Sequence, residues 1–108
     1  MFYLFAATII IGLSMAYIRF RGEPYPATGM VVIHFIFAAV ALASIIIVAA
    51  NDTNRTSHVT GPMILFCIVA VLGLVQLFGY HQRKKPLPKA LVIVHGALAI
   101  AAFIWLLA

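Results

Sequence analysis

Four long apolar runs without a charged residue constrain what this 108-residue chain can fold into. They cover about residues 1–18, 29–50, 62–80 and 90–108. A helix of about 18 residues, rising about 1.5 Å per residue, is near the length needed to cross a hydrocarbon core of roughly 30 Å. Only 8% of the residues are charged, which is too few to cover the surface of a soluble domain. The runs therefore predict a single all-α domain, an integral membrane four-helix bundle.

Basic residues gather in the first and third connections between these runs. The first connection holds Arg19 and Arg21, and the third holds Arg83, Lys84, Lys85 and Lys89. The middle connection, 51–61, holds only one basic residue, Arg55, together with Asp52. Lys and Arg in short loops stay on the cytoplasmic side. We therefore expect a multi-pass protein of the bacterial inner membrane with both termini outside. The net charge of +5 then indicates contact with an anionic lipid bilayer and not with nucleic acid.

Two stretches of the chain resemble each other. "GEPYPATGMVVIHFIFAAVA" begins at Gly22 and "KKPLPKALVIVHGALAIAA" begins at Lys84. Each holds a Pro-x-Pro turn, an apolar helix start, one histidine and then alanines. The preceding apolar runs also correspond. We interpret the chain as two tandem helical hairpins that enter the membrane in the same direction, a parallel internal repeat.

The repeat places His34 and His95 at similar depth on two helices that run the same way. Residues at i+4 and i+7 stack on the same helix face as residue i. These positions are alanines in both halves, namely Ala38, Ala41, Ala99 and Ala102. A histidine beside small residues leaves a flat slot on its helix, and two facing slots would accept a flat ligand. The pattern predicts a b-type haem with His34 and His95 as its two axial ligands.

The nearby basic residues suit the carboxylates of such a ligand. Haem propionates directed toward the basic loops would find four cations there, with Lys85 beside them: Arg19, Arg21, Arg83 and Lys84. Bis-histidine ligation fills both axial positions and favours electron transfer over oxygen binding.

Other interpretations of the same residues stay open at this point. Small residues on membrane helices also serve close helix packing, and His34 and His95 could form a hydrogen-bonded pair, a proton relay or another metal site. His58 lies among polar residues and is typical of a solvated loop. His81 ends the third run at the basic interface, as an interfacial anchor or a propionate partner would.

The segment "RKKPLPKALVIVHGALA", within a four-span frame, resembles that of a class of small bacterial membrane proteins. More broadly, the chain is similar to membrane b-type cytochromes, and this similarity depends on His34 and His95 alone. It implies one haem per chain and no particular substrate. The chain has no C-x-x-C-H motif for covalent haem attachment. It also lacks the membrane-embedded glutamate on which the similarly sized small multidrug transporters depend.

The sequence thus favours an electron-transfer protein with a quinone or a redox protein as partner, rather than a stand-alone enzyme. A non-catalytic scaffold subunit of a homodimer or larger complex is the alternative. A small transporter or channel lined by the two histidines is a third.

Overall fold

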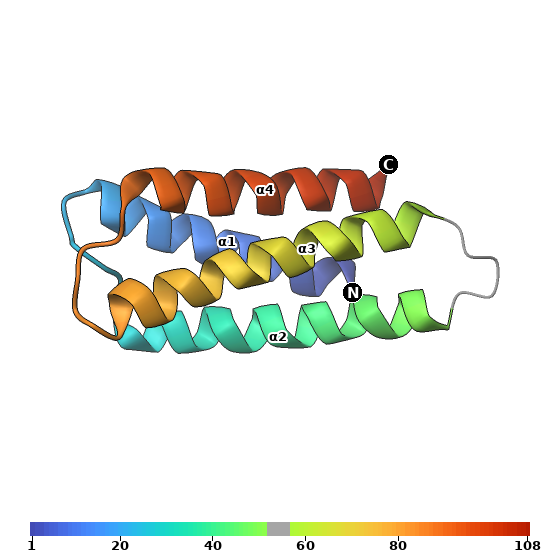
Figure 1. Cartoon of the computed structure of the whole chain (residues 1–108), viewed down its shortest axis with the longest axis horizontal. Helices are drawn as coiled ribbons and strands as arrows, with labels where there is room; N and C mark the ends of the chain where they lie inside the picture. Colours follow the sequence, from blue (N-terminus) through green and yellow to red (C-terminus); the bar gives the residue numbers. More distant parts are fainter. Residues whose placement is uncertain (52–56) are drawn as a thin grey trace.

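A computed structural model describes residues 1–51 and 57–108, except for the side chain of Ser57. The helices are α1 (Phe2–Phe20), α2 (Thr28–Ala50), α3 (Ser57–Gln76) and α4 (Lys89–Leu107), with the π-helical turn η1 (Leu77–His81) continuing α3 (Figure 1). All four are long and apolar enough to cross a membrane. The prediction of an all-α membrane bundle with four spans is confirmed. Arg55 and Asp52 of the middle connection lie outside the described residues.

The four helices form an elongated bundle of 47 × 21 × 20 Å. Helix α1 packs against α2 and α4, and α3 packs against the same two helices, so α1 lies diagonal to α3 and α2 lies diagonal to α4. Both termini lie at one end of the bundle, and the α1–α2 and η1–α4 connections lie at the other (Figure 1). We call the latter the basic end. The two histidine-bearing helices, α2 and α4, therefore lie on one diagonal of the bundle.

Large apolar side chains cover the outside of the bundle. More than half of the surface of Ile10, Ile36, Val71 and Ile104 is exposed. The packed core is small and lies toward the end with the termini; its buried members are Phe5, Ala41, Ile45, Val59, Phe66, Ala102 and Leu106. Such an apolar exterior is stable among lipid tails but would be unfavourable in water. The chain is therefore a multi-pass membrane protein.

Helix α3 extends beyond the apolar run that begins at Pro62. It begins at Ser57 and carries Pro62 as its sixth residue. The proline has no N–H to bond to the carbonyl of His58, and its ring crowds that carbonyl. Because Pro62 is close to the start of the helix, few hydrogen bonds are affected and the polar residues before it stay helical.

The two Pro-x-Pro turns interlock at the basic end. The backbone N–H of Leu87 donates to the carbonyl of Pro24 at 3.0 Å. Arg19 Nε in turn donates to the carbonyl of Leu87 at 2.8 Å. Leu87 and Pro26 are buried. The start of α2 is therefore tied to the start of α4, and the end of α1 is tied to both.

His81 belongs to this interlock. Its Nε2 lies 3.1 Å from the carbonyl of Pro26, within hydrogen-bond distance, and its ring meets the Tyr25 ring edge-on at 5.4 Å. The side chain is only 9% exposed. His81 therefore joins the end of η1 to the turn before α2 and is not an exposed interfacial anchor.

Gly61 marks a close contact between α3 and α4. A Cβ atom at this position would lie 2.4 Å from Cζ2 and 2.6 Å from Cη2 of Trp105. Real side chains do not approach so closely, so the indole can rest on α3 only because position 61 has no side chain.

We expect Gly61→Ala to lower the free energy of unfolding by about 1–3 kcal/mol, because the Trp105 ring must move away from the new methyl group. Gly96→Ala is the matched control, since a Cβ there meets no atom within 4 Å. That control should raise stability by up to about 1 kcal/mol through helix propensity. Unfolding in detergent followed by circular dichroism measures both, and equal effects would contradict the contact.

Candidate functional site

Two imidazole rings meet in the interior of the bundle. His34 is the seventh residue of α2 and His95 is the seventh residue of α4. Their ring centroids are 6.4 Å apart, with an angle of 68° between the ring planes. Because the interlock at the basic end fixes the starts of both helices, equal positions along them give equal depth. The two rings therefore meet edge-on across the bundle at similar depth.

Each ring rests against a glycine of a neighbouring helix. A Cβ atom at Gly12 of α1 would lie 3.0 Å from Cε1 of His34. A Cβ atom at Gly73 of α3 would lie 3.1 Å from Cε1 of His95. Both distances are tighter than most real Cβ contacts, so the two glycines admit the imidazoles where other residues would push them aside.

The backbone one turn before each glycine also faces a ring. The backbone of Thr8 lies beside His34, and that of Val69 lies beside His95. Thr8 and Val69, Gly12 and Gly73, and His34 and His95 are each separated by 61 residues. The stacked Phe5 and Phe66 rings, with centroids 4.0 Å apart, share that separation. The surroundings of the two histidines therefore match position by position.

Both rings retain a polar atom without a partner. Among the described residues, Nδ1 of His34 and Nδ1 of His95 are buried and have no hydrogen bond. A buried nitrogen without a partner is costly in a bilayer, where no water replaces the bond. Two such atoms therefore lie close to each other in the interior of the bundle. Nδ1 of His81 is unpartnered as well, in the separate setting of the basic end.

The alanine strips are only partly available as a slot. Ala38 and Ala99 are half-buried and lie one turn from the histidines. Ala41 and Ala102 have no exposed surface and belong to the core cluster that contains Phe5 and Phe66. The second alanine of each strip, Ala41 or Ala102, is thus covered by packed side chains. Only the first alanine, Ala38 or Ala99, remains available beside the ring.

The predicted propionate partners lie farther along the bundle. Arg19 and Arg21 are seven and nine residues beyond Gly12. That separation corresponds to about 10 and 13 Å along the helix axis. Arg19 is engaged with the carbonyls of Leu87 and Glu23. Arg21, Arg83 and Lys84 are exposed at the basic end. The structure does not bring these four cations into contact with the imidazole pair.

The described residues offer no larger ligand cluster. Within 1–51 and 57–108, no group of three or more His, Cys, Asp or Glu side chains could hold a metal ion. A structural zinc site uses four such ligands. The described residues therefore contain no such cluster around the two histidines.

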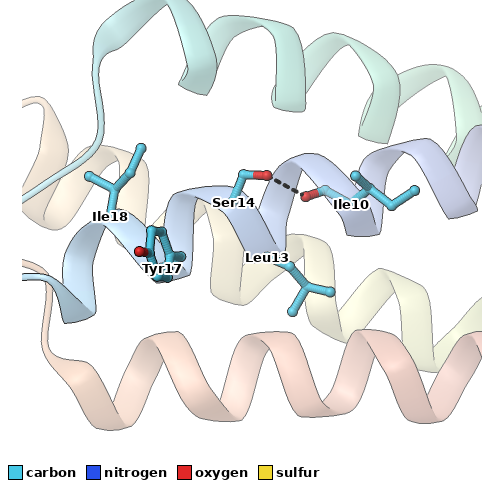
Figure 2. A pocket seen from close by; sticks show the side chains of 5 residues that line it. All are labelled: Ile10, Leu13, Ser14, Tyr17 and Ile18. Carbon is cyan, nitrogen blue, oxygen red and sulfur yellow. Dashed lines mark hydrogen bonds between the residues drawn. The ribbon is translucent and has the colours of Figure 1, made fainter.

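A shallow, open groove on the outer side of α1 differs chemically from the imidazole pair. All of its lining residues belong to α1. Figure 2 shows its lining, with Ser14 Oγ donating to the carbonyl of Ile10 at 3.0 Å. The other lining residues are apolar or aromatic: Leu13, Tyr17 and Ile18. Its only hydroxyl-to-backbone bond is internal to α1, so the groove offers contact area rather than catalytic groups.

The sequence analysis did not identify the contacts of Gly12 and Gly73 with the histidines, because small residues on membrane helices also serve close helix packing. The available signal was the 61-residue spacing that relates both glycines and both histidines. Only the structure shows that each glycine serves the histidine of its own hairpin.

We expect Gly12→Ala to move the ring of His34 by a few tenths of an ångström, and Gly73→Ala to do the same to His95, because a methyl group would press on Cε1. A proton–carbon NMR spectrum of protein labelled in its histidine rings should show the largest change at the histidine next to the substitution. Gly29→Ala is the control, since its Cβ meets no atom within 4 Å. A largest change at His58 or His81 in either variant would contradict the contacts.

Comparison with protein-family models, with curated proteins and with solved structures finds no match to this chain. Its function is therefore argued from the contacts of the described residues.

Proposed function

We propose that this chain is a membrane b-type haem protein, with His34 and His95 as the axial ligands, that carries electrons within or near the membrane. The observation that carries the proposal is the pair of half-buried imidazoles that meet across the bundle with their ring centroids 6.4 Å apart. Three features of the site support it.

The first is the spacing of the rings. A metal–imidazole bond is about 2.0–2.1 Å long, and the ligating nitrogen lies about 1.2 Å from its ring centroid, so two imidazoles on opposite sides of one metal have centroids about 6.5 Å apart. The observed 6.4 Å agrees with this sum. A direct hydrogen bond between the rings would bring the centroids closer, to about 5 Å.

The second feature is the setting of the ring nitrogens. A metal-bound histidine usually donates its other N–H to a backbone carbonyl or a carboxylate, which fixes the tautomer and the ring orientation. The backbone of Thr8 faces His34 and that of Val69 faces His95. We propose that the buried Nδ1 of each ring donates to that backbone when the ligand is bound. Nε2 would then be the ligating atom on both sides.

The third feature is the small size of the residues that border the rings. Gly12 and Gly73 have no side chain where the imidazoles rest. Ala38 and Ala99 lie one turn from the histidines on α2 and α4. Small residues at these positions would favour a flat ligand between the two histidines.

When bound, haem supplies a one-electron redox centre, and with both axial positions filled it carries electrons rather than binding oxygen. The chain supplies the two ligands, an apolar surround and a fixed depth. Each histidine is six residues past the start of its helix. This puts it about 9 Å from the basic end of α2 or α4. A quinone or a redox protein is the proposed partner, and the role is electron transfer rather than stand-alone catalysis.

The propionate contacts remain part of the proposal. Arg21, Arg83 and Lys84 have exposed, flexible side chains at the end nearer the histidines, and Arg19 has N–H groups beyond those it uses in the interlock. Charge-assisted bonds from such groups to a carboxylate are strong. Any of them would anchor the edge of the cofactor that faces the basic end.

We further propose that the chain arose as two tandem hairpins and lies in a bacterial inner membrane with the basic end in the cytoplasm. Matched contacts separated by 61 residues support the repeat. Six of the seven Lys and Arg residues belong to the two connections at one end, which supports the orientation.

The groove on α1 favours a second candidate, a non-catalytic subunit of a homodimer or larger membrane complex. Ile10, Leu13 and Tyr17 are more than half exposed there, although lipid tails would also cover them. This candidate needs no cofactor and leaves the histidines as a packed polar pair.

We expect the protein purified from haem-replete cells to show a Soret band and a low-spin reduced-minus-oxidised spectrum, with one haem per chain. His34→Ala and His95→Ala should each abolish the low-spin signal, because each removes one axial ligand. His58→Ala is the matched control, since that side chain is exposed outside the bundle interior, and it should leave the spectrum unchanged.

A colourless folded protein would overturn the proposal. Stoichiometric co-purification of other membrane proteins, unaffected by the two histidine substitutions, would then favour the accessory subunit. Transport activity lost in those variants, without pigment, would favour a small transporter or channel.

A further inference from the structure

The basic end carries exposed cations without an acidic partner among the described residues. We define the basic collar as the exposed residues Arg21, Arg83, Lys84, Lys85 and Lys89. No ion pair joins any of them to an acidic side chain within the described part of the chain, in which Glu23 is the only Asp or Glu. Like charges crowded together repel one another, so a collar without counter-charges calls for an anion from outside the chain.

Lys84 adds a conformational signal. Its backbone φ is +54°, and it is the only residue other than glycine with a positive φ among those described. This left-handed conformation favours glycine or asparagine, and a lysine there is strained. Backbone bonds hold it in place, since the N–H of Lys84 donates to the carbonyl of His81 at 3.1 Å and that of Lys85 to Tyr80 at 2.8 Å. Glycine would make the same turn without strain, but it would bring no charge.

The turn that carries these cations is rigid on its inner side. His81 before it is buried against Pro26, and Leu87 after it is buried and bonded to Pro24 and Arg19. Arg83, Lys84 and Lys85 are therefore held on the outside of a fixed loop.

The collar also lies at the level of a membrane interface. The guanidinium of Arg21 is 5.6 Å from the Tyr17 ring centroid, and Lys89 Nζ is 5.8 Å from that of Phe20. Both rings are about half exposed at the end of the apolar surface of α1. Aromatic side chains at such an edge mark the depth of lipid headgroups, so the adjacent cations reach headgroup phosphates.

We propose that the basic collar binds the phosphates of anionic lipid headgroups in the leaflet at the basic end, and that Lys84 keeps its strained conformation to hold its ammonium in that site. The inference does not depend on haem. Each basic residue near an anionic surface strengthens binding by about fivefold. Phosphatidylglycerol is the probe, because it carries one negative charge, and phosphatidylcholine is its neutral counterpart.

The test is native mass spectrometry of the full chain, released from detergent with either lipid. The wild type should bind phosphatidylglycerol in preference to phosphatidylcholine. Lys84→Gly should bind phosphatidylglycerol about fivefold more weakly, and Arg83→Gln/Lys84→Gly/Lys85→Gln about 100-fold more weakly. Lys84→Arg, which keeps the charge, is the matched control and should bind as the wild type does.

Two further readouts separate this role from others. Lys84→Gly should melt at a higher temperature than the wild type in neutral detergent, because the backbone strain is relieved, so weaker lipid binding cannot reflect unfolding. Inorganic phosphate should not displace the lipid. Equal binding of both lipids, unchanged binding by Lys84→Gly, or full displacement by inorganic phosphate would overturn the proposal. So would a Lys84→Gly variant that alters the haem spectrum while binding phosphatidylglycerol normally, since that outcome assigns Lys84 to a propionate.

Discussion

The close contact of each histidine ring with a glycine on the neighbouring helix determines the centre of this bundle. Gly12 and Gly73 let α1 and α3 approach the rings closely enough that His34 and His95 meet across the diagonal. The interlock of the two Pro-x-Pro turns supplies the other requirement, a common starting depth for α2 and α4. The glycine contacts fix the lateral positions of the two rings, and the interlock fixes their depth along the membrane normal.

Much of this fold was predictable from the sequence because the apolar composition indicates that lipid surrounds the chain. Uncharged runs of spanning length predict helices, since lipid leaves a single-pass segment no other way to satisfy its backbone. The short connections then require antiparallel neighbours, which leaves α2 diagonal to α4. His34 follows Pro26 by eight residues and His95 follows Pro88 by seven, and this near-equal spacing was enough to predict their similar depth.

The details of the site could not be predicted, because they depend on tertiary contacts that the pattern of apolar residues does not reveal. Alanine at positions 41 and 102 fits a cofactor slot and a phenylalanine stack equally well, and only the position of Phe5 and Phe66 decides between them. Arg19 appeared free to bind an anion, but its reach to a carbonyl 68 residues away depends on how the two turns meet. The helical residues of α3 before Pro62 were not evident from the sequence, because a proline is typical of the first position of a helix.

The central claim is that one metal lies between two histidines that the bundle holds 6.4 Å apart. The most direct measurement is an experimental density map of the protein purified from haem-replete cells. The account predicts continuous density joining the Nε2 atoms of His34 and His95 through the centre of a planar ring that passes beside Gly12 and Gly73. Imidazoles bonded directly to each other, or to water alone, in a fully folded bundle would contradict it.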